Sequence, residues 1–203
     1  MRRRGFLLNS FLFSTSALLP LNIFKRDKPS LKIGIIADVH QDIIFDGTKR
    51  IKKFLNDARK LNVDFIIQLG DFALPRNVNQ KFINTWNNYN GLKYHVLGNH
   101  DMVDFGFKKD QTMKWWGMNK RYYSFDKGGL HFIVLDGNDK NPGDWKEYYY
   151  RYIGAEQRNW LENDLKQTNF PVIIFSHQSL DANSGIKNRD EIRKIIEGIK
   201  FKN

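Results

Sequence analysis

The segment Tyr94–Asp104 reads YHVLGNHDMVD, and its second half is unusual for the end of a buried strand. An apolar run closes at Gly98, and three polar residues follow without a break: Asn99, His100 and Asp101. Turns favour Asn, Gly and Asp for backbone reasons alone, so a single ending of this kind indicates a turn as readily as a functional site. The rest of the chain has to distinguish the two.

The segments around this one predict an α/β fold. Short β-branched apolar runs predict buried strands, and apolar residues recurring every three or four positions predict amphipathic helices. Strands are predicted over 31–37, 63–69, 94–97, 122–126, 130–135 and 171–176, and helices over 48–62, 79–89, 155–167 and 189–199. The first five of these elements alternate as β-α-β-α-β, which predicts parallel strands with helical crossovers. The strands over 122–126 and 130–135 flank Lys127-Gly128-Gly129 and predict a hairpin.

Four of the predicted strands stop at potential metal ligands. They end at Asp38-Val39-His40, at Gly70-Asp71, at Asn99-His100-Asp101 and at Ser176-His177. The carboxyl ends of strands converge on one crevice in open α/β sheets, so these residues are expected to meet. Carboxylate, imidazole and amide ligands suit Mn, Fe and Zn, and a carboxylate can bridge two such ions. The pattern therefore predicts a binuclear metal centre that acts on a phosphate ester, with water activated as a hydroxide.

The ordered set Asp38-x-His40, Gly70-Asp71, Gly98-Asn99-His100-Asp101 and His177 resembles the motifs of the calcineurin-like metallophosphoesterases. The similarity covers about residues 31 to 200, and the hairpin sequence resembles the branch with purple-acid-phosphatase-like enzymes and exported bacterial alkaline phosphatases. The resemblance implies a hydrolase with a four-layer α/β/β/α sandwich of two mixed sheets. It implies hydrolysis of a phosphomonoester or phosphodiester in a phosphorylated small molecule.

The resemblance also implies a role for each motif residue. Asp38 and His40 would hold the first ion, and Asp71 would bridge the two. Asn99 and His177 would hold the second ion. His100 would act as the general acid that protonates the leaving group, and Asp101 would orient His100. The residues that bind the substrate are not predicted.

The sequence departs from the family pattern near its end. The family closes with a Gly-His-x-His motif that supplies one imidazole to each metal, whereas this chain has no histidine after His177 and stops at Asn203. Each ion would then have three protein ligands, and the last strand or strands would be missing. We expect either an incomplete copy of a longer protein or a decayed or specialised short form. The chain as given is then expected to bind metal weakly and to turn over little. The alternative function is a non-catalytic or decayed fragment that binds phosphate or metal without turnover.

The first 30 residues are predicted to lie outside this domain, which spans 31–203. Residues 1–24 have three arginines followed by an uncharged, mostly apolar segment, which is typical of an export signal. Arg3-Arg4-Gly5-Phe6-Leu7 resembles a twin-arginine signal, so the export machinery is an expected partner and the protein is expected to be periplasmic or extracellular. An uncleaved membrane anchor and an irrelevant leader remain alternatives. Residues 25–30 are predicted to be a linker.

Composition limits the other possibilities. The chain of 203 residues is 41% hydrophobic and is predicted to form one domain. It carries a formal net charge of +11, but its basic residues are dispersed, so no nucleic-acid-binding face is expected. It has no cysteine, which excludes disulfides, thiolate ligands and thiol nucleophiles.

Several further polar and aromatic residues are predicted to have mostly structural roles. His95 and His131 are predicted to pack within strands, and Asp136, Asp139 and Asp144 to form turns. Gln41 and Asp42 are predicted either to contact substrate or to shape a loop. A set of rings is predicted either to stack a nucleoside at the rim of the site or to cover apolar surface: Trp115, Trp116, Trp145, Tyr148, Tyr149 and Tyr150.

Overall fold

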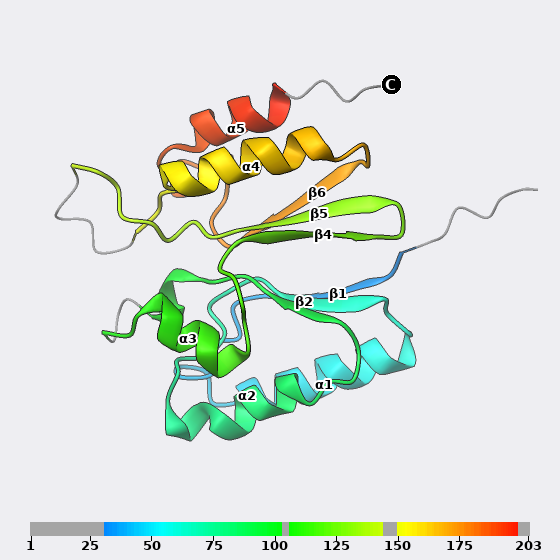
Figure 1. The fold of residues 1–203 in the computed structure, drawn as a ribbon. Helices are drawn as coiled ribbons and strands as arrows, with labels where there is room; N and C mark the ends of the chain where they lie inside the picture. The colour runs from blue at the N-terminus through cyan, green and yellow to red at the C-terminus, as the bar shows by residue number, and fades with distance from the viewer. Residues whose placement is uncertain (1–30, 103–105, 144–149, 199–203) are drawn as a thin grey trace, which may run out of the picture.

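The computed structural model describes residues 31–102, 106–143 and 150–198, and these form four layers (Figure 1). Two helices cover one three-stranded sheet, a second three-stranded sheet packs against its other face, and two further helices cover the second sheet. The predicted signal and linker lie outside the described residues. No helix in the described part of the chain is both long and apolar enough to cross a bilayer.

The first sheet is parallel throughout its described strands. It has the order β1 (Ile33–Ile36), β2 (Phe65–Gln68) and β3 (Lys93–His95). Helices α1 (Gly47–Lys60) and α2 (Gln80–Asn87) are the crossovers between these strands. Their apolar faces bury Leu55, Phe82 and Trp86 against the sheet, as the periodicity of both segments predicts.

The second sheet is mixed. Strand β4 (Tyr123–Lys127) runs antiparallel to β5 (Leu130–Leu135), which runs parallel to β6 (Val172–Ser176). Helices α4 (Ala155–Gln167) and α5 (Arg189–Glu197) cover its outer face. A hydrophobic core lies between the two sheets. Its buried residues include Phe65, Ile67, Val96, Phe132, Val134 and Phe175. This core joins the two halves of the chain.

The predicted two-sheet α/β architecture is confirmed, with two differences in detail. The resemblance implies two mixed sheets, but the described strands of the first sheet are all parallel. In addition, the sequence analysis missed helix α3 (Lys109–Trp116). This helix is short, and it buries only Thr112 and Trp116, so its sequence carries little periodic signal. Two short 3-10 turns, η1 (Asn77–Asn79) and η2 (Asn99–Asp101), complete the described elements.

Candidate metal centre

The predicted ligands Asp38, His40 and Asp71 come together at the carboxyl ends of β1 and β2. One ligand atom from each lies within 4.8 Å of the others. The Nε2 atom of His40 is 3.4 Å from Asp71 Oδ2 and 3.9 Å from Asp38 Oδ1. Backbone bonds from Asp38 N–H to the Gly70 carbonyl and from His40 N–H to the Asp71 carbonyl continue the strand pairing into the two loops. The parallel sheet thus aligns the two motifs.

His177, at the end of β6, reaches the same point from the second sheet. Its Nε2 lies 3.4 Å from Asp71 Oδ2, while its Nδ1–H donates to the Leu69 carbonyl at 2.8 Å. This backbone bond fixes the ring so that Nε2 faces Asp71. Burial lowers the pKa of His177, but the hydrogen bond and charge of Asp71 outweigh it and raise the pKa to about 9. Burial raises the pKa of Asp71, but the hydrogen bond and the charge of His177 outweigh burial and hold this pKa below its usual value.

The backbone at the predicted ligands Asp38, His40 and Asp71 is strained. Asp38, His40 and Asp71 have φ angles of 52°, 46° and 52°, in the left-handed region that is unfavourable for residues with a side chain. In the described part of the chain, Asn62 alone among other non-glycine residues has a positive φ. Strain of this kind persists where the surrounding structure enforces it, and it concentrates at functional sites. The sequence offers no direct signal of it.

Asp101 and Gly98 hold the loop after β3 against the loop after β2. The Asp101 carboxylate is buried and accepts the backbone N–H groups of Gly98, Asp71 and Phe72 at 2.7 to 2.8 Å. Burial and the nearby Asp71 raise the pKa of Asp101 to about 8, although these N–H donors favour the carboxylate. A Cβ atom at Gly98 would collide with the backbone N and the Oδ1 of Asp71. Only glycine permits this approach.

His100 and Asn99 lie in η2, beside the ligand cluster. The His100 N–H donates to Asp71 Oδ1 at 2.9 Å, and its ring lies 5.4 Å from the His40 ring between centroids. Asn99 precedes it and is half buried. The predicted effect of Asp101 on the His100 side chain stays a prediction, because the bonds described for the Asp101 carboxylate run to backbone groups. Through them, Asp101 fixes the loop that carries His100.

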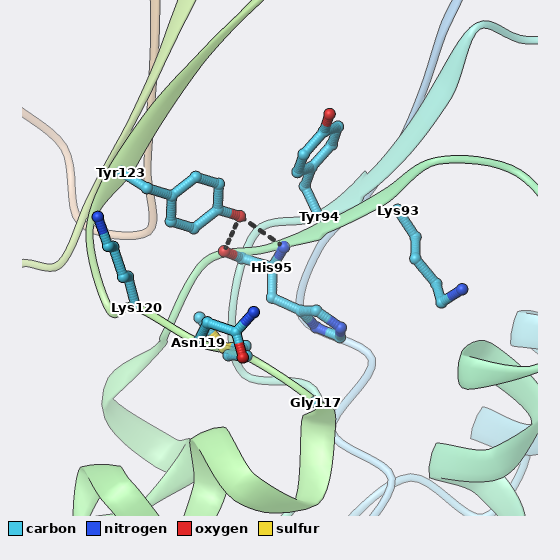
Figure 2. A pocket seen from close by; sticks show the side chains of 8 residues that line it. Lys93, Tyr94, His95, Gly117, Asn119, Lys120 and Tyr123 are labelled. Carbon is cyan, nitrogen blue, oxygen red and sulfur yellow. Dashed lines mark hydrogen bonds between the residues drawn. The ribbon is translucent and has the colours of Figure 1, made fainter.

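The structural roles predicted for His95 and His131 fit their positions. His95 is buried, its Nε2 accepts the Trp86 indole N–H at 3.0 Å, and burial lowers its pKa to about 3. It also borders a cavity of about 350 Å³, where the Tyr123 hydroxyl bonds to both backbone groups of His95 (Figure 2). His131 lies at the opposite end of the second sheet from His177. None of the predicted metal ligands lines this cavity.

Two of the predicted turn formers do more than shape a turn. Asp136 does accept the Asn138 N–H two residues on, but it is fully buried. Its carboxylate and that of Asp139 share two cations, Lys109 and Arg121, at 2.7 to 2.9 Å. The sequence analysis missed this four-charge cluster because its members are up to 30 residues apart. Asp144 lies outside the described residues.

The remaining residues that the sequence suggested for substrate contact are Gln41, Asp42 and the aromatic set. Asp42 accepts Leu74 N–H and the Asn79 amide, which supports its loop role. Gln41 Oε1 accepts the Thr48 hydroxyl. Of the aromatic set, Trp116 is buried in the core, so it does not reach the rim. Trp115 and Tyr150 are half buried, and Trp145, Tyr148 and Tyr149 lie outside the described residues.

The comparison with known families agrees with this geometry. A family model described as calcineurin-like phosphoesterase matches residues 31–202.

The chain belongs to the calcineurin-like phosphoesterase family.

It is 23% identical over 238 residues to the manganese-dependent ADP-ribose/CDP-alcohol diphosphatase of Arabidopsis thaliana, with 83% of this chain and 76% of the relative covered. Its fold is similar to that of a dimetal phosphatase from Danio rerio, at a TM-score of 0.61 and 15% identity, with 83% of this chain and 77% of that chain covered. As a calcineurin-like phosphoesterase with such relatives, the protein is a hydrolase.

The donor atoms of the cluster fit a divalent metal ion. Asp38 and Asp71 offer carboxylate oxygens, and His40 offers an imidazole nitrogen, which is a hard-to-borderline set. Within the described residues, no lysine or arginine side chain bonds to Asp38 or Asp71; their partners in the cluster are histidines and backbone N–H groups. A metal ion would therefore enter this calcineurin-like centre without displacing a lysine or arginine.

Proposed function

We propose that the protein hydrolyses phosphate esters of small molecules with two metal ions held by Asp38, His40, Asp71, Asn99 and His177. The observation that carries the proposal is the convergence on Asp71. His40 and His177, which are far apart in the sequence and come from different sheets, each place Nε2 3.4 Å from the same oxygen, Asp71 Oδ2. A carboxylate approached in this way from two sides is suited to bridge two ions.

Each protein group has a distinct task in this proposal. Bound ions would supply Lewis acidity that lowers the pKa of water and neutralises charge on the phosphoryl group. Asp71, on which His40 and His177 converge, would hold both ions. The ring of His100 lies beside that of His40, and His100 would donate a proton to the leaving group. Asp101 holds the loop of His100 against that of Asp71.

The names of the relatives and the charge of the chain support the substrate class that we propose. The Arabidopsis thaliana relative is named for action on ADP-ribose and CDP-alcohols, so nucleoside diphosphate compounds are the first substrates to test. The net charge of +11 favours such anions electrostatically. Phosphomonoesters and phosphodiesters complete the set that we propose.

A substrate panel with Mn, Zn and Fe tests the proposal. The full chain is expected to hydrolyse at least one phosphorylated compound in a metal-dependent manner, and Asp71→Asn should abolish this. Metal or phosphate binding by calorimetry without turnover of any compound would instead support the alternative of a non-catalytic fragment. His131→Gln is the matched control, because it changes a paired histidine at the far end of the second sheet.

We also propose that residues 1–24 direct export and that the protein acts in the periplasm or outside the cell. The motivation is the arginine pair ahead of an apolar segment. Replacing Arg3 and Arg4 together with lysine keeps the charge but removes the guanidinium pair. Cell fractionation should then find the protein retained, and unchanged export would contradict a twin-arginine signal.

A further inference from the structure

The two proposed metal positions differ in what holds their ligands together. Asp38, His40 and Asp71 all follow strands of the first sheet, and backbone bonds join their loops directly. The second position combines Asn99, which follows β3 of the first sheet, with His177, which follows β6 of the second. Its geometry therefore depends on the spacing between two sheets at this edge.

One buried side chain bonds to both of the loops concerned. Asn138 follows β5 and is 1% exposed. Its Nδ2 donates to the Leu97 carbonyl at 3.0 Å, two residues before Asn99. Its Oδ1 accepts the Gln178 Nε2–H at 2.6 Å, one residue after His177. A single amide group thus spans the gap between the Asn99 loop and the His177 loop.

Asn138 is itself held in place. Asp136 Oδ1 accepts both the backbone N–H and the Nδ2–H of Asn138, at 3.0 and 2.8 Å. The other oxygen of Asp136 bonds to Lys109 and Arg121. Gln157 binds the Asp136 backbone through both ends of its amide. The Asn138 side chain therefore has one orientation available, and it presents a fixed donor and a fixed acceptor.

Gln178 depends on this contact. It is 8% exposed, and its Oε1 has no hydrogen-bond partner in the part of the chain that the structure describes. The bond from its Nε2 to Asn138 is then the described bond that orients the side-chain amide, while the Ser176 hydroxyl donates to the Gln178 backbone carbonyl. Loss of Asn138 would leave a second buried polar group unpaired, which increases the tendency of this loop to move.

From these contacts we propose that Asn138 is a positioning residue that sets the distance between Asn99 and His177 and so controls affinity for the second metal ion. The inference rests on the proposed function, because it presupposes two ions. It predicts a selective effect: the first ion, held by loops of one sheet, is bound as before, whereas the second is bound about 10–100-fold more weakly when its supporting contact is lost.

Two variants and a matched control test the inference on the full chain. Asn138→Ala removes both contacts. Asn138→Asp keeps the shape but replaces the Nδ2 donor with an oxygen that faces the Leu97 carbonyl and the Asp136 carboxylate. Asn188→Ala is the control, because Asn188 is another buried asparagine, and its side-chain amide bonds to both backbone groups of Ile153 and to neither Leu97 nor Gln178. Thermal unfolding measures any general loss of stability in each variant.

Calorimetric titration with Mn²⁺ gives the number of ions and the affinity for each, and electron paramagnetic resonance distinguishes a coupled manganese pair from isolated ions. Both Asn138 variants should lose the coupled signal and keep one ion, while Asn188→Ala keeps two. If Asn138→Ala does not fold, Gln178→Leu, which removes the bond between Asn138 and the His177 loop and keeps the bond to Leu97, should give the same selective loss.

The outcomes separate this inference from the proposed function. A parent chain that takes up fewer than two ions overturns both. Two ions in the parent with an unchanged second affinity in the Asn138 variants overturn the inference alone. The inference is also overturned if the Asn138 variants lose affinity equally for both ions, or if Asn188→Ala shows the same selective loss. The effect would then come from general destabilisation.

Discussion

The second sheet carries a histidine paired with carboxylates at each of its ends, and the two clusters behave differently. His131 is the second residue of β5, and His177 follows the end of β6, which runs parallel to β5. His131 bonds through Nδ1 to Asp126 at 2.6 Å and through Nε2 to Asp164 at 2.8 Å. Both nitrogens are therefore occupied by short bonds.

The cluster around Asp71 is open by comparison. His40 and His177 place Nε2 3.4 Å from Asp71 Oδ2, which is longer than the bonds of His131, and both approach the same oxygen. The backbone is left-handed at Asp38, His40 and Asp71. The same residue types thus form a saturated cluster that stabilises the fold and a strained, unsaturated one suited to a metal ion. Four predictions test this contrast.

The largest difference is expected in turnover. Asp71→Asn removes the charge on which both histidines converge. Loss of a group that only supports a metal ligand costs up to about 100-fold, and Asp71 is proposed as a direct ligand, so metal-dependent hydrolysis should fall more than about 100-fold. Asp164→Asn removes one carboxylate partner of His131 and should leave turnover unchanged. Initial rates at saturating metal check both. Comparable losses in the two variants would remove the functional distinction between the clusters.

The next effect concerns stability at the open cluster. Gly98→Ala places a methyl group against the Asp71 backbone, so unfolding should become easier by about 3 kcal/mol, in the range for overpacking. Gly117→Ala is the control: its φ is 75°, but nothing lies within 4 Å of the added Cβ, so only strain of about 1 kcal/mol is expected. Denaturant unfolding measures both. Equal losses would show that the close approach at Gly98 is unimportant.

The saturated cluster should affect stability in a pH-dependent way. Burial lowers the pKa of His131, but Asp164 and Asp126 outweigh it and raise the pKa above its ordinary value. The cluster therefore stabilises the fold fully below the unfolded pKa of about 6.5, and this contribution is lost as the pH rises through the higher folded value.

His131→Gln should accordingly cost about 2 kcal/mol in mildly acidic solution, as expected for hydrogen bonds to charged groups. The difference from the parent should shrink as the pH is raised. Unfolding free energies of both proteins from about pH 5 to about pH 9 measure it. A difference that stays constant or grows with pH would contradict a charged His131.

The smallest effect isolates backbone strain at the open cluster. His40→Ala and His40→Gly both remove the imidazole, but only glycine relieves the φ of 46°. The glycine variant should be more stable than the alanine variant by about 1 kcal/mol in the absence of metal. Thermal unfolding compares the pair directly. An alanine variant of equal or greater stability would show that the loop relaxes without strain.

The sequence predicted the members of the open cluster well but could not separate it from other polar contacts. The strand endings at Asp38, Asp71 and His177 predict that these side chains lie close together, because the carboxyl ends of strands meet at one edge of the fold. The bounds of α4 agree with the prediction residue for residue, since its periodicity is local. Asp136 was predicted only to form a turn, because its partners Lys109 and Arg121 lie far away in the sequence.

By itself, then, the sequence determined the α/β class, the family and the residues that meet at the strand ends, all of which follow from local patterns repeated in order. The tertiary structure alone decided which histidine is saturated, why residue 98 must be glycine, and that Asn138 joins the Asn99 and His177 loops. These features depend on distances of a few Å between segments that are remote in the chain. Such distances are set by the packing of the two sheets on their shared core.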